Sequence, residues 1–270
     1  MADALVDSVV DAVPYWVLHV DLDQFLAAVE VLRRPELAGL PVVVGGKGDP
    51  TLRGVVAAAS YPARERGVYA GTPLRTAAKR CPDAVFLPAD NPHYEEVSEE
   101  VMAALRGIPG VVVEVMGWDE AFVGARTADP DALARRIQES VLEATHLHCT
   151  VGIGDNLLRA KLATGFGKPA GIYRLTARNW AEVMFDRPTR ALWGIGAKTA
   201  ATLAERGLHT VADLAGADLD ALAADLGPAM GPWYVQLGRG IARQEVHGTP
   251  WVRRSRSRET TFQRDLVDWD

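Results

Sequence analysis

The sequence predicts an α+β fold: a ferredoxin-like, split βαβ antiparallel sheet with an inserted small α/β segment, followed by an all-helical region. Up to residue 168, strand-like and amphipathic helical segments follow one another as β–(insertion)–α–β–β–α–β. The insertion, residues 25–87, contains strand-like and helical segments of its own. Beyond residue 169 the chain changes to short helical segments and tight turns.

Four apolar segments predict the sheet. Residues 16–21 alternate side chains along a strand and carry His19 and Asp21 on one side. Residues 111–116 and 120–125 are strand-like and joined by a tight turn, which predicts a hairpin. Residues 149–154 are the fourth strand. In a ferredoxin-like sheet the first strand lies in the middle, beside the second strand of this hairpin.

The helices of this unit are predicted from their first residues. Asn91 and Asp129 each precede a proline, and apolar side chains follow at helical spacing. Asp155 is predicted to cap a third helix that ends at Gly165.

Composition narrows the classes of protein. With 270 residues, 48% of them hydrophobic, the chain can bury a substantial core. No segment has the length of a membrane span, and the first 13 residues do not resemble a signal peptide. The two cysteines, Cys81 and Cys149, give no disulfide framework, so a cytoplasmic location is expected. The net charge of −6 argues mildly against the binding of nucleic acid. One short segment is nevertheless strongly basic, because it contains Arg253, Arg254, Arg256 and Arg258.

The helical region contains one recognisable pattern. Residues 192–208 predict a helix, a Gly194-Ile195-Gly196 turn and a second helix, which is a helix–hairpin–helix. Glycines allow a close approach to phosphate, and the second helix offers its N-terminal amides. We expect Gly194, Gly196 and Lys198 to contact duplex DNA, although the same glycine pattern also occurs in ordinary turns.

Acidic residues mark the candidate catalytic site. Asp21 ends the first strand and Asp23 follows it. Asp119 and Glu120 begin the second hairpin strand. The predicted topology places Asp21 next to Asp119 and Glu120, where three carboxylates repel one another unless cations neutralise them. A site of oxygen ligands that leaves coordination positions open suits Mg²⁺, and two such ions can support phosphoryl transfer. The alternative is that Asp23 only caps the following helix and Asp21 ends a strand in water.

Four segments carry a resemblance to a family. VDLDQFLAAVE, ASYPARERGVYAGTP, WDEAF and RAKLATGFGKPAGI occur in the order and spacing of Y-family translesion DNA polymerases, and they resemble the DNA polymerase IV type most. The resemblance runs from about residue 16 to the end of the chain. It implies this division: leader 1–13, palm 14–24 and 88–168, fingers 25–87, thumb 169–246, and 247–270 as a linker and the start of a little finger domain. Residues 255–266 are then the first strand of that domain, most of which is expected to be missing.

The resemblance also assigns roles. Asp21, Asp119, Glu120 and the Leu22 carbonyl hold two Mg²⁺ ions, for which Mn²⁺ can substitute. The residues implied to bind the incoming nucleotide are Tyr61, Arg64 and Lys161 on its phosphates and Phe25 and Leu26 near its sugar. The implied partners of this monomer are primer-template DNA, deoxyribonucleoside triphosphates and, through a C-terminal region, a sliding clamp; a membrane is not among them.

Three positions depart from the family pattern. Ala58 stands where a hydroxyl residue is usual, and Gly117-Trp118 replaces Ser-Ile before the acid pair, where a buried tryptophan could reshape the primer-end pocket. Leu26 replaces an aromatic residue that excludes the ribose 2′-hydroxyl, so we expect ribonucleotides to be used as well. The predicted function is template-directed, error-prone translesion DNA synthesis. The alternatives are a catalytically inactive scaffold at damaged DNA and a nucleotide cyclase, which would need no helix–hairpin–helix.

Overall fold

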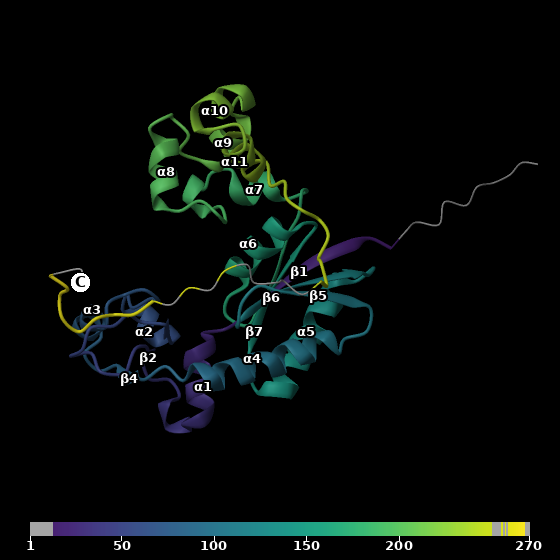
Figure 1. Ribbon diagram of the computed structural model, residues 1–270. Helices are drawn as coiled ribbons and strands as arrows, with labels where there is room; N and C mark the ends of the chain where they lie inside the picture. The colour runs from purple at the N-terminus through teal and green to yellow at the C-terminus, as the bar shows by residue number, and fades with distance from the viewer. Residues whose placement is uncertain (1–12, 250–254, 256, 258, 268–270) are drawn as a thin grey trace, which may run out of the picture.

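A five-stranded sheet forms the centre of the computed structural model, which describes residues 13–249, 255, 257 and 259–267 (Figure 1). The strand order is β5-β6-β1-β7-β8, and β1 pairs antiparallel with both β6 and β7. The strands are β1 (Tyr15–Leu22), β5 (Val111–Val115), β6 (Glu120–Arg126), β7 (Cys149–Gly154) and β8 (Ile172–Leu175). The predicted split βαβ unit, with its first strand in the middle, is confirmed.

Strand β8 was not predicted. It pairs in parallel with β7, so the sheet is mixed rather than purely antiparallel. Its four residues, IYRL, are too few to show a period, and their strand conformation depends on the edge that β7 presents. The prediction of helices and turns alone beyond residue 169 is therefore wrong at this point.

Side chains of β1 alternate between two differently covered faces of the sheet. Leu18, Val20 and Leu22 are buried in the core beneath α4 (Asn91–Arg106) and α5 (Pro130–Thr145). His19 and Asp21 lie on the opposite face, where α6 (Leu157–Gly167) packs against the sheet. The catalytic acids predicted from the sequence are thus on the face that α4 and α5 leave uncovered.

Glycines in β7 allow α6 to lie close to the sheet. A Cβ atom at Gly152 would fall 2.2 Å from the Ala160 carbonyl oxygen, and one at Gly154 would fall 2.4 Å from the Ala160 nitrogen. Any larger residue at either position would push α6 outward. The close packing of α6 brings its side chains directly beside those of β1.

Helix starts were predicted with mixed success. The Asp129 side chain accepts a hydrogen bond from Ala132 N (2.9 Å) and caps α5, as expected. Asp155 does not cap α6, because Asn156 has the extended backbone of a capping residue and accepts from Arg159 N (2.9 Å). Asp155 instead pairs with the Arg159 side chain at 2.7 Å, and the helix ends at Gly167 rather than Gly165.

The insertion forms a three-stranded sheet of order β3-β2-β4 with short helices. Its elements are α1 (Phe25–Arg33), the 3₁₀ turn η1 (Pro35–Leu37), β2 (Val42–Val44), β3 (Ala58–Ala59), α2 (Tyr61–Glu65), α3 (Leu74–Arg80) and β4 (Val85–Leu87). The strand-like and helical segments expected in this insertion are present, and β4 pairs in parallel with β2. Helix α1 buries Phe25, Ala27 and Val29 in the core of the large sheet.

The helical region has its own core and lies apart from the insertion (Figure 1). Its elements are α7 (Trp180–Met184), the 3₁₀ turn η2 (Thr189–Ala191), α8 (Ala197–Ala204), α9 (Val211–Gly216), α10 (Leu219–Leu226) and α11 (Met230–Gly238). The predicted helix starting at residue 192 is absent, because only η2 precedes the glycine turn. The second predicted helix is α8.

The chain after α11 returns to the large sheet. Leu157 N donates to the Arg243 carbonyl (3.0 Å), and Val246 N donates to the Tyr15 hydroxyl (3.1 Å). Val246 packs with Val17 and Phe122 on the same face as α6. This segment therefore joins the helical region to the sheet near the start of β1.

Residues 259–267 contain neither helix nor strand. The prediction of a strand over 255–266 is therefore wrong for residues 259–266. The Gln263 side chain instead makes hydrogen bonds with the backbone N–H and carbonyl of Arg53, in a loop of the insertion. The predicted arginine run, Arg253 to Arg258, and the leader up to residue 12 lie outside the described residues. Within the described part of the chain, no helix is long and apolar enough to cross a bilayer.

Candidate active site

Strand pairing brings the predicted acids together. Asp21 lies directly opposite Glu120 in the β1–β6 register, and Leu22 N donates to the Asp119 carbonyl at 2.8 Å. Side chains opposite one another in a ladder share a face of the sheet. The predicted placement of Asp21 beside Asp119 and Glu120 is confirmed, while their roles as metal ligands stay a prediction.

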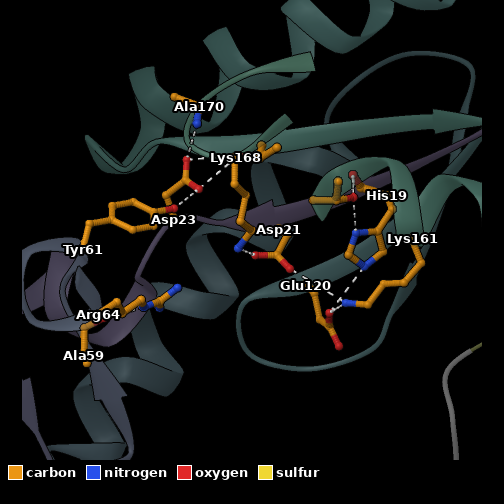
Figure 2. A network of polar contacts seen from close by, with 12 residues as sticks. His19, Asp21, Asp23, Ala59, Tyr61, Arg64, Glu120, Lys161, Lys168 and Ala170 are labelled. Atoms are coloured by element: carbon orange, nitrogen blue, oxygen red, sulfur yellow. Dashed lines mark hydrogen bonds and ion pairs between the residues drawn. The ribbon is translucent and has the colours of Figure 1, made fainter. Parts of the chain in front are cut away.

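Two lysines of α6 and its C-terminus neutralise these acids (Figure 2). Lys161 Nζ binds Glu120 Oε2 and lies 3.8 Å from Asp21 Oδ2, and Lys168 Nζ binds Asp21 Oδ1. Among the described residues, no three His, Cys, Asp or Glu side chains are gathered closely enough to hold a metal ion. The ammonium groups thus provide the positive charge that the carboxylates require.

The two adjacent acids differ in their affinity for protons. Desolvation by the surrounding protein, and then the charges of Asp21 and Glu120, raise the pKa of Asp119. The His19 imidazole, acting against burial, and the Lys161 ammonium lower the pKa of Glu120 to about 2. Opposite pKa shifts in neighbouring acids are typical of functional sites rather than of surface acids in water.

A cavity of about 510 Å³ opens in front of Asp21 and Asp119, between the large sheet and the insertion, and Glu120 does not line it. Its chemistry is mixed: carboxylates at one end, two cationic side chains, and apolar walls. The lining residues are Asp21, Leu22, Gln24, Phe25, Leu26, Ala57, Ala58, Ala59, Arg64, Tyr69, Ala70, Trp118, Asp119 and Lys168. A cavity of this size and composition fits a small charged ligand.

Only part of the predicted phosphate-binding set lines the cavity. Arg64 does, with its Nε donating to the Ala59 carbonyl at 2.8 Å. Tyr61 does not, since its hydroxyl donates to Asp23 Oδ1 at 2.7 Å, and Lys161 lies on Glu120. Lys168 lines the cavity but was not singled out. It follows Lys161 by seven residues, a helical spacing that keeps both on one face and was available as a signal.

Asp23 is not a helix cap. It is buried and accepts hydrogen bonds from the Tyr61 hydroxyl (2.7 Å), Thr150 Oγ1 (3.0 Å) and Ala170 N (2.7 Å) (Figure 2). The capping position of α1 belongs to Gln24, whose side chain makes no capping bond. Asp23 therefore ties the insertion, β7 and the loop after α6 to one another, a role that its neighbours in sequence could not indicate.

Leu26 and Trp118 form apolar walls of the cavity. Leu26 is half-buried, whereas Phe25 is 4% exposed and packs against Tyr94 with ring centroids 6.5 Å apart. Trp118 is 37% exposed, so it is not the buried tryptophan that would reshape the primer-end pocket. The aromatic Tyr69, which sequence reasoning did not select, also lines the cavity.

The helix–hairpin–helix turn lies near the sheet. Gly194 has φ +95°, and a Cβ atom there would fall 2.9 Å from the Trp233 ring. Gly196 precedes α8, and Lys198 is exposed in its first turn. Trp193 packs on Phe122 of β6, with ring centroids 6.2 Å apart. The turn is thus fixed on both sides, while its contacts with DNA stay a prediction.

Comparisons with known proteins agree on one family. A model described as the impB/mucB/samB family matches residues 20–165, and one described as a SAM-like helix-hairpin-helix tandem matches residues 191–228. The chain is 54% identical to DNA polymerase IV 2 of Mycobacterium tuberculosis over 95% of its length and 75% of that protein. It is 42% identical to DNA polymerase IV of Methanoculleus marisnigri over 93% of the chain and 71% of that protein.

Solved structures give the same result. DinB from Sulfolobus solfataricus matches with a TM-score of 0.75 and 29% identity, covering 86% of this chain and 69% of that one. An insertion ternary complex of Dbh DNA polymerase matches with the same TM-score, identity and coverage. The five-stranded sheet, the insertion and the helical region described above are therefore an arrangement that solved polymerases share.

Proposed function

Because this chain belongs to the Y family of DNA polymerases, in the DNA polymerase IV group, we propose that its cavity binds an incoming nucleotide and two divalent cations. The chain is a DNA-directed DNA polymerase of the translesion type. The proposed reaction joins the primer 3′-hydroxyl to the nucleotide α-phosphorus. The bond from that phosphorus to the bridging oxygen breaks, and pyrophosphate leaves.

The cations are assigned to Asp21, Asp119, Glu120 and the Leu22 carbonyl. Carboxylate and carbonyl oxygens are the ligands that Mg²⁺ prefers, and Mn²⁺ accepts them as well. Lysine ammonium groups already lie on Asp21 and Glu120, which supports these carboxylates as a place for cations. When bound, two such ions lower the pKa of the attacking hydroxyl and stabilise the leaving oxygen.

The chain's own cationic residues are assigned to the triphosphate. Arg64 offers a forked donor and Lys168 a point charge, and both line the cavity. Tyr61 and Lys161, which the resemblance adds to this set, contact Asp23 and Glu120 in this structure. Their polar groups hold these two acids in place beside the cavity.

The sugar of the incoming nucleotide is assigned to Leu26. This side chain lines the cavity near Asp21 and has a smaller cross-section than an aromatic ring. A leucine wall that does not collide with a 2′-hydroxyl rejects ribonucleotides only weakly. We therefore include ribonucleoside triphosphates among the substrates, and primer-template DNA as the partner that the helix–hairpin–helix turn binds.

The observation that carries this proposal is the pairing of Asp21 with Glu120, next to Asp119, at the edge of a cavity that also contains Arg64 and Lys168. Carboxylates that can bind cations lie close to basic side chains that can bind phosphates. This combination suits a triphosphate with bound metal ions. A scaffold without catalysis would gain nothing from carboxylates that repel one another.

Primer extension by Asp119→Asn tests the proposal. We expect extension to fall by several orders of magnitude, on the scale expected for losing charge stabilisation at the reacting centre, with primer-template affinity unchanged by fluorescence anisotropy. Asp131→Asn, which removes an acid on α5 far from the cavity, is the control and should extend normally. Near wild-type extension by Asp119→Asn would show that this acid holds no essential cation.

A further inference from the structure

His19 is a buried polar residue beside the candidate catalytic acids. It lies on β1, two residues before Asp21 and on the same face of the sheet, and it is 0% exposed. Burying an imidazole costs free energy unless both ring nitrogens find partners. Its surroundings therefore indicate what the ring does.

Two contacts hold the ring in place. Nδ1 lies 2.9 Å from Thr164 Oγ1 of α6, and the edge of the ring meets Phe122 with centroids 4.9 Å apart. Gly152, directly opposite on β7, has no side chain and leaves room for the imidazole under α6. Rotation of the ring would break the Thr164 contact and collide with Phe122.

The second ring nitrogen points toward the site. Nε2 lies 3.4 Å from Glu120 Oε2, longer than an ordinary hydrogen bond, and makes no hydrogen bond among the described residues (Figure 2). Glu120 Oε2 is also the atom that Lys161 binds. A histidine with a purely structural role would direct both nitrogens into the core, whereas this one directs Nε2 at a catalytic carboxylate.

The chemistry of the two neighbours indicates how the ring is held. A carboxylate oxygen accepts hydrogen bonds, so Glu120 Oε2 favours a hydrogen on the nitrogen that faces it, Nε2. The Thr164 hydroxyl can donate or accept, so it can serve Nδ1 as a partner, and it also lies 3.1 Å from the Ala160 carbonyl oxygen.

We propose that His19 is a positioning residue that, backed by Thr164, holds Oε2 of Glu120 and so fixes the direction of its other oxygen toward the cations. This inference rests on the proposed role of Glu120 as a cation ligand. Groups that orient a metal ligand contribute about 10–100-fold in metal affinity or activity. Losing the His19 donor should therefore slow the reaction without weakening the binding of nucleotide or DNA.

Three substitutions separate the donor from the packing. His19→Gln places an amide N–H near the position of Nε2 and should retain most activity. His19→Asn is one methylene shorter and reaches only toward Thr164, and His19→Phe keeps the ring against Phe122 without any N–H. We expect His19→Asn and His19→Phe to lower kcat by about 10–100-fold at an unchanged KM for the nucleotide. Thr164→Val, which removes the backing hydroxyl, should have a smaller effect of the same kind.

Cation binding provides a readout without turnover. Mn²⁺ titration followed by electron paramagnetic resonance should show weaker binding by His19→Asn and His19→Phe than by His19→Gln and the wild type. Melting temperatures should not follow this order, because the phenylalanine variant retains the apolar packing. If His19→Gln and His19→Asn are equally impaired, or if activity follows melting temperature, His19 is only a packing residue.

Glu120→Ala, in parallel, separates failure of this inference from failure of the proposed function. Loss of extension and of Mn²⁺ binding by Glu120→Ala, together with unimpaired His19→Asn and His19→Phe, would overturn the role of His19 alone. Unchanged extension and Mn²⁺ binding by Glu120→Ala would overturn the proposed cation ligand itself, and with it the positioning role.

Discussion

Leu26 determines how wide the cavity is beside the proposed sugar position. It lies on the first turn of α1, whose register is fixed because Phe25 and Ala27 on either side of it are buried in the core. The Leu26 side chain therefore cannot turn away from the cavity without displacing the helix. Phe25, packed on Tyr94, is not available to replace it as a wall.

Substitution of this residue should change which sugars the enzyme accepts. We expect Leu26→Phe to raise the ratio of kcat/KM for deoxyribonucleotides over ribonucleotides by on the order of 10²-fold, because a rigid ring would collide with the 2′-hydroxyl. The measurement is single-nucleotide insertion opposite one template base with both sugars. Leu26→Met, similar in volume, is the control; equal ratios for wild type and Leu26→Phe would make Leu26 ordinary packing.

Lys161 and Lys168 have different surroundings in the structure, and we expect different roles for them. Lys168 lines the cavity, so Lys168→Ala should raise the KM for the incoming nucleotide, by about tenfold for a lost charge-assisted contact. Lys161 lies on Glu120, so Lys161→Ala should mainly lower kcat. Steady-state kinetics of the two variants on one primer-template test this difference. A rise in KM alone for Lys161→Ala would support the assignment made from the sequence.

At the scale of elements, the glycine turn before α8 is held in one conformation. Gly194 needs a positive φ and lies against Trp233, while Gly196 has an ordinary φ of −80° and open space around its Cβ position. The two glycines of the motif are thus not equivalent, although the sequence pattern treats them alike.

This difference predicts unequal effects of alanine. Gly194→Ala should cost about 1–2 kcal/mol in the turn and reduce duplex affinity by roughly tenfold, with the KM for the nucleotide unchanged. Gly196→Ala, the matched control, should bind DNA normally, whereas Gly196→Asp should weaken binding because it adds a negative charge at the α8 N-terminus. Fluorescence anisotropy with a labelled duplex measures both. Equal affinities for Gly194→Ala and wild type would exclude this turn from the DNA interface.

At the scale of the whole molecule, a net charge of −6 opposes the binding of DNA. Binding must then depend on local cations, among which Lys198 is exposed beside the glycine turn. We expect duplex affinity to fall steeply with salt, and Lys198→Gln to reduce the slope of log K against log[salt] by about 1.

The control for this measurement is Arg136→Gln. Arg136 is exposed on α5, on the face of the sheet away from the acids and the turn, and its removal should leave the slope unchanged. An unchanged slope for Lys198→Gln would place the phosphate contacts elsewhere on the molecule.

The sequence by itself determined the split βαβ order and the meeting of Asp21 with Glu120, because alternating side chains and a tight hairpin allow few ways to pair these strands. Tertiary structure alone decided the bonds of Asp23, the position of Lys168 on Asp21, the pairing of β8 and the direction of His19. Asp23 and Tyr61 are 38 residues apart, Asp21 and Lys168 are 147 apart, and His19 and Glu120 are about a hundred apart, so no local pattern records these contacts. Gly152 and Gly154 let α6 pack close to the sheet, which brings the end of this helix, with Lys168, to Asp21 and brings Thr164 to His19.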